Sequence, residues 1–461
     1  MNYKKDEVLF KAGKRYRLPM DSIESPNMDI VEKLIEKHKI DDVPHHKNLQ
    51  KYYVGKHDIL NRRFRDPSKP NQKLVNPFGK LITDQLTSYF VGKPVRYTAE
   101  KETKDYLERL QFIFDINNES AHNSEMAKTA SINGVAYELL WVDEKGIPRF
   151  NQVPINEMLV VYDNKLDPQP LMAVRHYTVY NYLTEKEEIM VEIYTKNAVF
   201  KYVKGEKDFV EQSVEPHYFG NVPVIPYFNN QDGLGDWQVV TPLIDAYDTM
   251  QSDTANDFEY FADAYLALKG VIDTQPEDIS EMKENRVMLL GEQGDAQWLV
   301  KQTDFTSIDG FKKRITDDIF RFSGTVDMAE IANVSNISGV AIQYKLLSTE
   351  ALTANKERQF RKSLMKRIEL ITAILNLQGH NFIHTDVEIQ FIRNIPQNIQ
   401  ENIQLVSQLF GTVSHKTLLS QLPFIADPEM ELQMLNEEKQ NQVAEDYEFP
   451  LEVNTEGESA E

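Results

Sequence analysis

Hydrophobic and polar positions follow a helical pattern through residues 236–270. Apolar side chains recur there at steps of three, four or their multiples, which places them on one stripe of a helix. The stripe consists of Val240, Leu243, Tyr247, Met250, Phe258, Phe261 and Tyr265. Thr241 and Pro242 suit a helix cap and first turn, and Gly270 suits the end of the segment. We therefore predict one long helix that leads into a strand.

A second amphipathic helix is predicted from about residue 307. Its apolar stripe is formed by Ile308, Phe311, Ile315 and Ile319, with Lys312, Lys313 and Arg314 beside it. Between the two helices, residues 267–302 contain short strand patterns and a helix that would start at Pro276. We expect two helices that bracket a compact insert rich in β-structure.

The part of the chain before residue 236 changes from helical to strand patterns. Separate helices are predicted from Ser25 and Pro26 through Ile35, and at residues 49–60, 77–90, 104–112 and 119–132, with a basic loop at 61–72. From about residue 135 to Pro226, alternating segments rich in Tyr and Val predict an antiparallel meander. Because lysine and arginine do not interleave with the aromatic residues, we expect this sheet to pack on helices rather than to stack nucleic-acid bases.

The remaining segments are mostly helical. Residues 323–339 are small and polar, which is typical of a mobile loop or a broken helix. Residues 340–378 are helical in pattern throughout and would reach about 55 Å at 1.5 Å per residue. A strand follows at 387–396, then helices near 397–410, 414–421 and 428–440, and an acidic tail at 441–461 that we expect to be disordered.

Composition excludes several classes of function. The formal net charge of the 461 residues is −21, which argues against tight, non-specific binding of nucleic acid by the whole surface. The sequence has no cysteine, so it has no disulfide, thiol nucleophile or cysteine-ligated metal. No apolar run is long enough for a membrane span, and the first residues lack the apolar core of a signal peptide. We expect a protein made in a reducing cytoplasm, without contact to a membrane.

The helix predicted at 236–270 is acidic outside its apolar stripe. It carries Asp245, Asp248, Asp253, Asp257, Glu259 and Asp263. Carboxylates at helical spacing can hold divalent metals for phosphoryl transfer, and Asp245, Asp248 and Asp253 are the candidate ligands. These side chains scatter around the helix instead of converging, which favours a solvated face. A face of this kind could also line a channel, because negative charge keeps a polyanion from sticking.

Other candidate chemistry is sparse. The sequence contains no phosphate-binding G-x-x-x-x-G-K-[ST] loop, no H-E-x-x-H and no G-x-S-x-G. His380, His384 and Asp386 are close in sequence, but they follow Gly379 at a helix end and need not share a face. The basic residues between Lys356 and Arg367 are interpreted as a solvated face paired with acidic neighbours rather than as phosphate contacts. We expect no enzyme, no cofactor and no metal.

Four segments in order carry a family resemblance. They are YYVGKHDIL at 52–60, LVNPFGKLITDQLTSYFVGKPVRY at 74–97, LIDAYDTMQSDTANDFEYFADAYLALKG at 243–270 and SGVAIQYKL at 338–346. Together they resemble the portal proteins of tailed bacteriophages, of the Gp6-like (SPP1-type) group. The resemblance covers nearly the whole chain up to the final helices.

The resemblance implies an α+β portal fold. Residues 1–235 would form the wing, 236–266 the first stem helix, 267–302 a small α/β clip and 303–325 the second stem helix. Residues 326–338 would form a tunnel loop, 339–396 the long wing helix and strand, 397–440 a helical crown and 441–461 the disordered tail. Asn333, Ser335 and Asn336 are the expected DNA contacts of the tunnel loop. Asp253, Asp257, Lys312 and Lys313 are candidate channel-lining residues of the stem. Val326 precedes Asp327 where many relatives would have a proline.

The resemblance also implies a function. Members form a ring, usually of twelve subunits, at one capsid vertex, through which double-stranded DNA is packaged, retained and ejected. The implied partners are other copies of the chain, the terminase large subunit, head-to-tail adaptor proteins, and the major capsid and scaffolding proteins. The implied location is the virion, after assembly in the bacterial cytoplasm. Two alternatives from other classes are a metal-dependent phosphoryl-transfer enzyme that uses Asp245, Asp248 and Asp253, and a helical scaffold without a channel.

Overall fold

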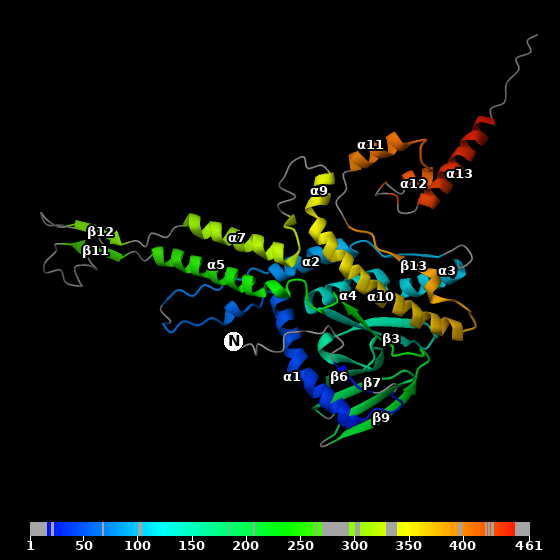
Figure 1. The fold of residues 1–461 in the computed structure, drawn as a ribbon, viewed down its shortest axis with the longest axis horizontal. Coiled ribbons are helices and arrows are strands. Elements are labelled where there is room, and N and C mark those ends of the chain that lie inside the picture. Colours follow the sequence, from blue (N-terminus) through cyan, green and yellow to red (C-terminus); the bar gives the residue numbers. More distant parts are fainter. Residues whose placement is uncertain are drawn as a thin grey trace, which may run out of the picture. The chain divides into compact units, whose positions relative to one another are not determined.

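The protein is a mixture of helices and sheets, shown as a computed structural model in Figure 1. The structure describes residues 16–19, 23–66, 69–99, 104–183, 185–205, 208–262, 265–269, 295–299, 305–328, 339–394, 399–419, 422, 425 and 428–447. The chain divides into two compact units. Unit 1 comprises Met1–Asn333 and Lys345–Asn394, and unit 2 comprises Val334–Tyr344 and Ile395–Glu461.

The first helix of unit 1, α1 (Met28–Tyr53), is longer than the sequence suggested. Its cap is Asn27, whose side chain accepts the N–H groups of Asp29 and Ile30, so the predicted start at Ser25 and Pro26 was two residues early. The prediction of separate helices at 26–35 and 49–60 was also wrong, because α1 continues through Pro44. A proline inside a helix removes one hydrogen bond. Burial of the helix on both sides of Pro44 compensates for that loss, with Val31 and Ile35 before it and Leu49 and Tyr52 after it.

Two sheets replace the single predicted meander. The first has the order β1–β5–β6–β7–β8–β9 and consists of Tyr16–Arg17, Met158–Tyr162, Pro170–Asn181, Lys186–Tyr194, Ala198–Lys204 and Phe209–Pro216. Its strands β5 to β9 are antiparallel as predicted, whereas β1 pairs with β5 in parallel. The second sheet has the order β10–β3–β4 and consists of Val224–Phe228, Val135–Val142 and Pro148–Val153. Strand β10 therefore returns to β3 instead of continuing the meander.

The buried pattern of β3 explains why it needs partners on both edges. Ala136 and Leu140 belong to one hydrophobic core, and Val135 and Tyr137 belong to another. Successive side chains of a strand point to opposite faces, so both faces of β3 are covered. Most residues of β3 are buried, and buried backbone groups need hydrogen-bond partners, which β4 and β10 supply.

Helices cover these sheets. Helix α1 packs on the six-stranded sheet in a core with Leu159, Val161, Met172 and Val174. The second core joins the three-stranded sheet to α2 (Phe78–Val91), α3 (Lys104–Ile116), α4 (Glu119–Asn133) and α10 (Leu347–Leu377). The predicted helices at 77–90, 104–112 and 119–132 are thus confirmed. The predicted helix at 340–378 is divided at Leu346 into α9 (Gly339–Lys345) and α10. The strand predicted at 387–396 is β13 (Val387–Gln390), which pairs with β2 (Arg96–Ala99).

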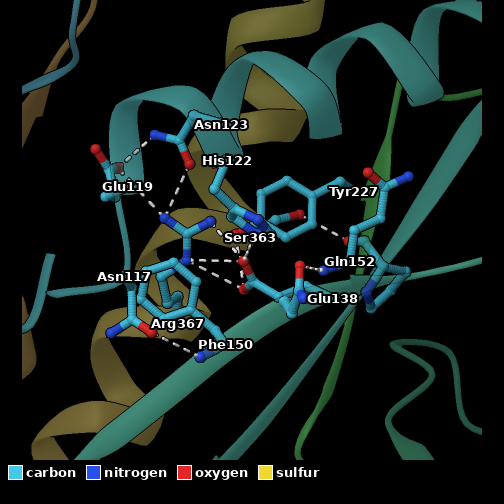
Figure 2. Close-up of polar contacts among 12 residues, drawn as sticks. Asn117, Glu119, His122, Asn123, Glu138, Phe150, Gln152, Tyr227, Ser363 and Arg367 are labelled. Atoms are coloured by element: carbon cyan, nitrogen blue, oxygen red, sulfur yellow. Dashed lines mark hydrogen bonds and ion pairs between the residues drawn. The ribbon is translucent and has the colours of Figure 1, made fainter.

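The sequence interpretation placed the basic residues of α10 on a solvated face. The structure shows that two of them are buried. Arg367 is completely buried, and its guanidinium contacts both oxygens of Glu138 on β3, with Nε–Oε distances of 3.0 and 3.1 Å. Its Nη1 donates to Asn123 and Glu119 of α4 at 2.9 and 3.3 Å. Figure 2 shows these side chains converging from α4, β3 and α10 on one buried point. Lys356 is buried in the same way and contacts Asp236, so the expected pairing with acidic residues is confirmed, but the expected solvation is wrong for these two residues.

The partners of Glu138 keep it ionised. Burial by itself would raise the pKa of Glu138, but the attraction of Arg367 and the hydrogen bond from His122 outweigh burial and lower that pKa to about 2. The Tyr227 hydroxyl of β10 donates a further hydrogen bond at 3.0 Å. Because the folded-state pKa lies below the ordinary value, this stabilisation is present at neutral pH and is lost as the pH falls toward 2.

Unit 2 contains three C-terminal helices in the predicted order. They are α11 (Ile399–Leu409), α12 (His415–Leu419) and α13 (Pro428–Tyr447). Helix α13 extends beyond residue 440, so the first part of the predicted disordered tail, residues 441–447, is helical. Residues 448–461 lie outside the described residues. Across the described parts of both units, no helix has the length and apolar character needed to cross a membrane.

The first testable prediction concerns the buried guanidinium. Replacing Arg367 by Met leaves Glu138 and Glu119 buried without their cation, which we expect to lower the free energy of unfolding by about 3–5 kcal/mol. Urea denaturation at neutral pH measures this loss. The deficit should shrink as the pH is lowered, because Glu138 can then become neutral.

Lys366→Met is the matched control, since Lys366 forms a partly exposed ion pair with Glu369 in the same turn of α10. We expect it to change the free energy of unfolding by less than about 1 kcal/mol. Equal losses in the two variants would contradict the assigned role of Arg367.

Candidate functional site

Two helices, α5 (Thr241–Ala262) and α7 (Phe305–Ser323), lie side by side and form the candidate functional site (Figure 1). A short 3-10 helix at Gln238–Val240 precedes α5, and strand β11 (Tyr265–Lys269) follows it. Strand β12 (Asp295–Leu299) pairs with β11 in antiparallel register and precedes α7. The predicted helix at 236–266 is therefore too long at both ends, and Tyr265 belongs to a strand instead of the apolar stripe.

The base of this helix pair is anchored in the core of unit 1. Trp237 is fully buried, and its indole N–H donates to Thr83 of α2 at 3.1 Å. Ile244 of α5 and Ile319 of α7 are buried in the same core. Farther along the pair, Phe258 and Phe311 of the predicted stripes are 58% and 56% exposed. Phe258 stacks on Phe305 of α7, with ring centroids 4.8 Å apart, but most of its surface and that of Phe311 stays uncovered by the described residues.

The acidic side of α5 is occupied by another segment of the chain, residues 62–77, which we call the strap. Asp248, Ser252 and Asn256 follow one another at four-residue intervals on α5. Their side-chain oxygens accept the backbone N–H groups of Asn76, Leu74 and Gln72 at 2.7, 2.9 and 2.7 Å. Four residues of helix rise by about 6 Å. Two residues of an extended chain cover about 6.5 Å, so the two repeats match.

We call these three hydrogen bonds, from Asp248, Ser252 and Asn256 to the backbone of the strap, the ladder. Polar contacts on both sides extend it. Asp248 also contacts the Nδ1 atom of His57 at 2.5 Å and the side-chain amide of Asn76 at 2.9 Å, and it is completely buried. The Tyr52 hydroxyl donates to Asp245 at 2.7 Å. Burial raises the pKa of Asp245, and the hydrogen bond from Tyr52 opposes that shift only partly. The N-terminal half of α5 is therefore joined to the end of α1 as well as to the strap.

The candidate channel-lining residues have different surroundings. Asp253 forms an ion pair with Arg62 of the strap at 2.6 Å, although 57% of its side chain stays exposed. Asp257 is half-buried on α5. Lys312 and Lys313 of α7 line a cavity of about 570 Å³ together with Tyr247, Thr316, Asp317, Phe320, Thr325, Val326 and Asp327. The structure thus brings the two lysines next to the beginning of the predicted tunnel loop.

The metal-site alternative is not supported by this geometry. Asp245, Asp248 and Asp253 bind Tyr52, His57 and Arg62, which are three separate partners. Within the part of the chain that the structure describes, no three acidic or histidine side chains converge in a way that could hold a metal ion. This also applies to His380, His384 and Asp386, where the His380 ring stacks on Phe382.

Several predicted site residues lie in segments that the structure does not describe. The tunnel-loop residues Asn333, Ser335 and Asn336 lie outside the described residues, as do residues 270–294 and 300–302 of the predicted clip. Conversely, sequence reasoning missed the ladder. Its signal was the run of Asp248, Ser252 and Asn256, short polar side chains at four-residue spacing on one helix. The sequence did not show that an extended segment from residues 72–76 would lie against them.

We predict that the ladder holds the strap in place. Ser252→Ala removes the acceptor for the Leu74 N–H, and an unmade buried hydrogen bond costs about 1–3 kcal/mol. Amide hydrogen exchange within residues 72–76 should therefore become faster. Thr249→Ala is the control, because the exposed Thr249 hydroxyl bonds only to the carbonyl of Asp245 in its own helix. Unchanged exchange in the Ser252 variant would contradict the role of the ladder.

Comparison with known proteins assigns the chain to a family. The sequence model of the family described as phage portal protein, SPP1 Gp6-like, matches residues 32–445. The portal protein of Bacillus phage SPP1 is 28% identical over 471 residues, which cover 95% of this chain and 90% of that protein. The portal protein of Clostridium phage phiCD119 is 25% identical over 431 residues, which cover 86% of this chain and 93% of that protein.

Solved structures give weaker similarity. A chain of the virion of the native gene transfer agent particle is 13% identical, has a TM-score of 0.45, and aligns over 82% of this chain and 93% of its own length. The sequence match, in contrast, extends over most of the chain and includes α5, α7 and the strap. The protein therefore belongs to the SPP1 Gp6-like family of phage portal proteins.

Proposed function

We propose that this portal protein assembles into a closed ring at one capsid vertex and that double-stranded DNA is packaged, retained and ejected through the central channel. The observation that carries the proposal is the family match over residues 32–445. The shape of the α5 and α7 pair supports it, because the two helices extend from a core anchored by Trp237 and carry aromatic side chains that the same chain leaves exposed. Such a surface is suited to contact a neighbouring copy.

In this proposal α5 and α7 are the stem helices, and each subunit makes a head-to-tail contact with the next. Head-to-tail contacts generate a ring when the rotation between subunits closes. Phe258 and Phe311 are the aromatic groups that a neighbour would cover. Asp253, Asp257, Lys312 and Lys313 remain the candidate channel-lining residues, and the ion pair of Asp253 with Arg62 reduces the negative charge that this residue would present.

The other parts follow the family organisation. Residues 267–302 would form the clip that docks the terminase large subunit during packaging and the head-to-tail adaptor proteins afterwards. Residues 1–235 and 339–396 would form the wing, and residues 397–440 the crown, with major capsid and scaffolding proteins as further partners. The sequence has no nucleotide-binding loop, so we assign ATP hydrolysis to terminase and no catalysis to this chain. We place the assembled protein in the virion, after assembly in the host cytoplasm.

Electron microscopy of the purified protein tests the ring. We expect class averages along the symmetry axis to show a closed ring with a hole wide enough for duplex DNA. A compact dimer without a channel would overturn the proposal, and an assembly through the long helices without a hole would favour the scaffold alternative. If the protein stays monomeric, the same measurement is made on isolated capsid vertices. The absence of a ring there would overturn the proposal.

The tunnel loop gives a further prediction. Asn333, Ser335 and Asn336 are proposed to touch the DNA backbone, because uncharged polar groups contact phosphate without adding the counterion-release attraction of lysine or arginine. Deleting residues 333–336 should leave ring assembly intact and reduce DNA packaging or retention. Packaged DNA per particle, measured by nuclease protection in an infection assay, checks this, and an unchanged amount would refute the assignment of the loop.

A further inference from the structure

The strap reverses the sign of charge on one side of α5. Between residues 61 and 73 the sequence carries Arg62, Arg63, Arg65, Lys69 and Lys73 against Asp66, in a chain whose net charge is −21. This basic segment is held over the acidic helix by the ladder and by the Arg62–Asp253 ion pair. A surface that the sequence predicts to be negative is therefore partly covered by a positive one.

The arginines of the strap divide into one that is used internally and two that are not. Arg62 donates to Asp253, to the Asn71 side chain at 3.1 Å and to the Gln72 carbonyl at 2.7 Å. Arg63 and Arg65 are exposed, and within the described parts of the chain neither has an ion pair or hydrogen bond. Contacts within the chain thus fix Arg62, whereas the guanidinium groups of Arg63 and Arg65 remain available to bind another molecule.

Three acids of α5 beside the strap interact with residues other than these two arginines. Asp248 is buried against His57, Asp253 is paired with Arg62, and Glu259 accepts a hydrogen bond from Gln72 at 2.9 Å. Phe64, between the two arginines, is 40% exposed, and the Arg62 guanidinium lies 4.9 Å from its ring centroid. The ring contact with Arg62 restricts Phe64, which lies between the two exposed arginines in the sequence.

We propose that Arg63 and Arg65 bind the phosphate backbone of double-stranded DNA. The proposal rests on the proposed function, which supplies DNA as the polyanion that passes this protein. A guanidinium group offers a planar fork of donors that matches two phosphate oxygens, and it does so without reading the base sequence. Two such contacts per subunit, on a chain that is otherwise strongly negative, give a local and salt-sensitive attraction, which is compatible with DNA that must move.

The test compares two variants with the same change in charge. Arg63→Gln/Arg65→Gln removes the proposed contacts, and Lys33→Gln/Lys37→Gln removes two exposed charges from α1. Binding of random-sequence duplex DNA to the full-length protein is measured at several salt concentrations, and its assembly state is recorded in the same samples. We expect the strap variant to bind at least about threefold more weakly than the wild type, with a salt slope smaller by about 0.9 for each lost phosphate contact. The control should bind like the wild type.

A third variant, Arg63→Lys/Arg65→Lys, keeps the charge but loses the guanidinium fork, so it should restore the salt slope and only part of the affinity, which a purely structural role of the strap would not predict. Wild-type affinity in the Gln variant, equal weakening in the control, or no DNA binding by the wild type would each overturn the inference. Loss of assembly in the Gln variant with unchanged DNA affinity would instead identify an acidic surface of a second copy as the partner. A wild type that binds DNA through the strap but forms no ring would contradict the proposed function and leave this inference intact.

Discussion

The ion pair of Arg367 and Glu138 connects the parts of unit 1 on which the helix pair depends. It joins α10 to β3, and the same two side chains contact α4 through Asn123 and His122 and β10 through Tyr227. Both charges are buried, so each is stable only while the other is present. This constraint holds α10 at one place on the three-stranded sheet. The fixed sheet and helices then provide the core against which Trp237 anchors the start of α5.

A second set of polar contacts connects α5 to the strap and to the end of α1. Asp248, Ser252 and Asn256 hold the strap by its backbone, while Tyr52 and His57 bring the end of α1 to the same helix. Most of the acidic residues that distinguish α5 in the sequence are therefore internal hydrogen-bond acceptors. Their number alone suggested a channel wall, but their partners show that part of this charge serves to attach the strap. Arg63 and Arg65 add exposed positive charge beside Asp253 and Glu259, which also remain exposed.

Predictions succeeded where a local pattern sufficed. Helices α2, α3, α4 and α7 and the three C-terminal helices were found at nearly the observed positions, because the spacing of apolar residues reflects the helical repeat. Predictions failed where contacts between segments distant in the sequence determine the structure. Two separate helices were expected at 26–35 and 49–60, but packing on both sides of Pro44 keeps α1 continuous. The strands were expected to form one meander, but the two buried faces of β3 recruit β10 from much later in the chain.

By itself the sequence determined the family, the mixed helical and strand composition, and the pair of amphipathic helices around a small insert, since these depend on motifs and on local periodicity. It could not determine which charges are buried. Arg367 and Lys356 share a helix with solvated lysines and arginines, and only the approach of β3 and of Asp236 distinguishes them. Likewise, Asp248 and Asp253 are similar residues on one helix, and their roles follow from the strap. Tertiary structure decided these points, because the cost of burying a charge depends on partners that are distant in sequence.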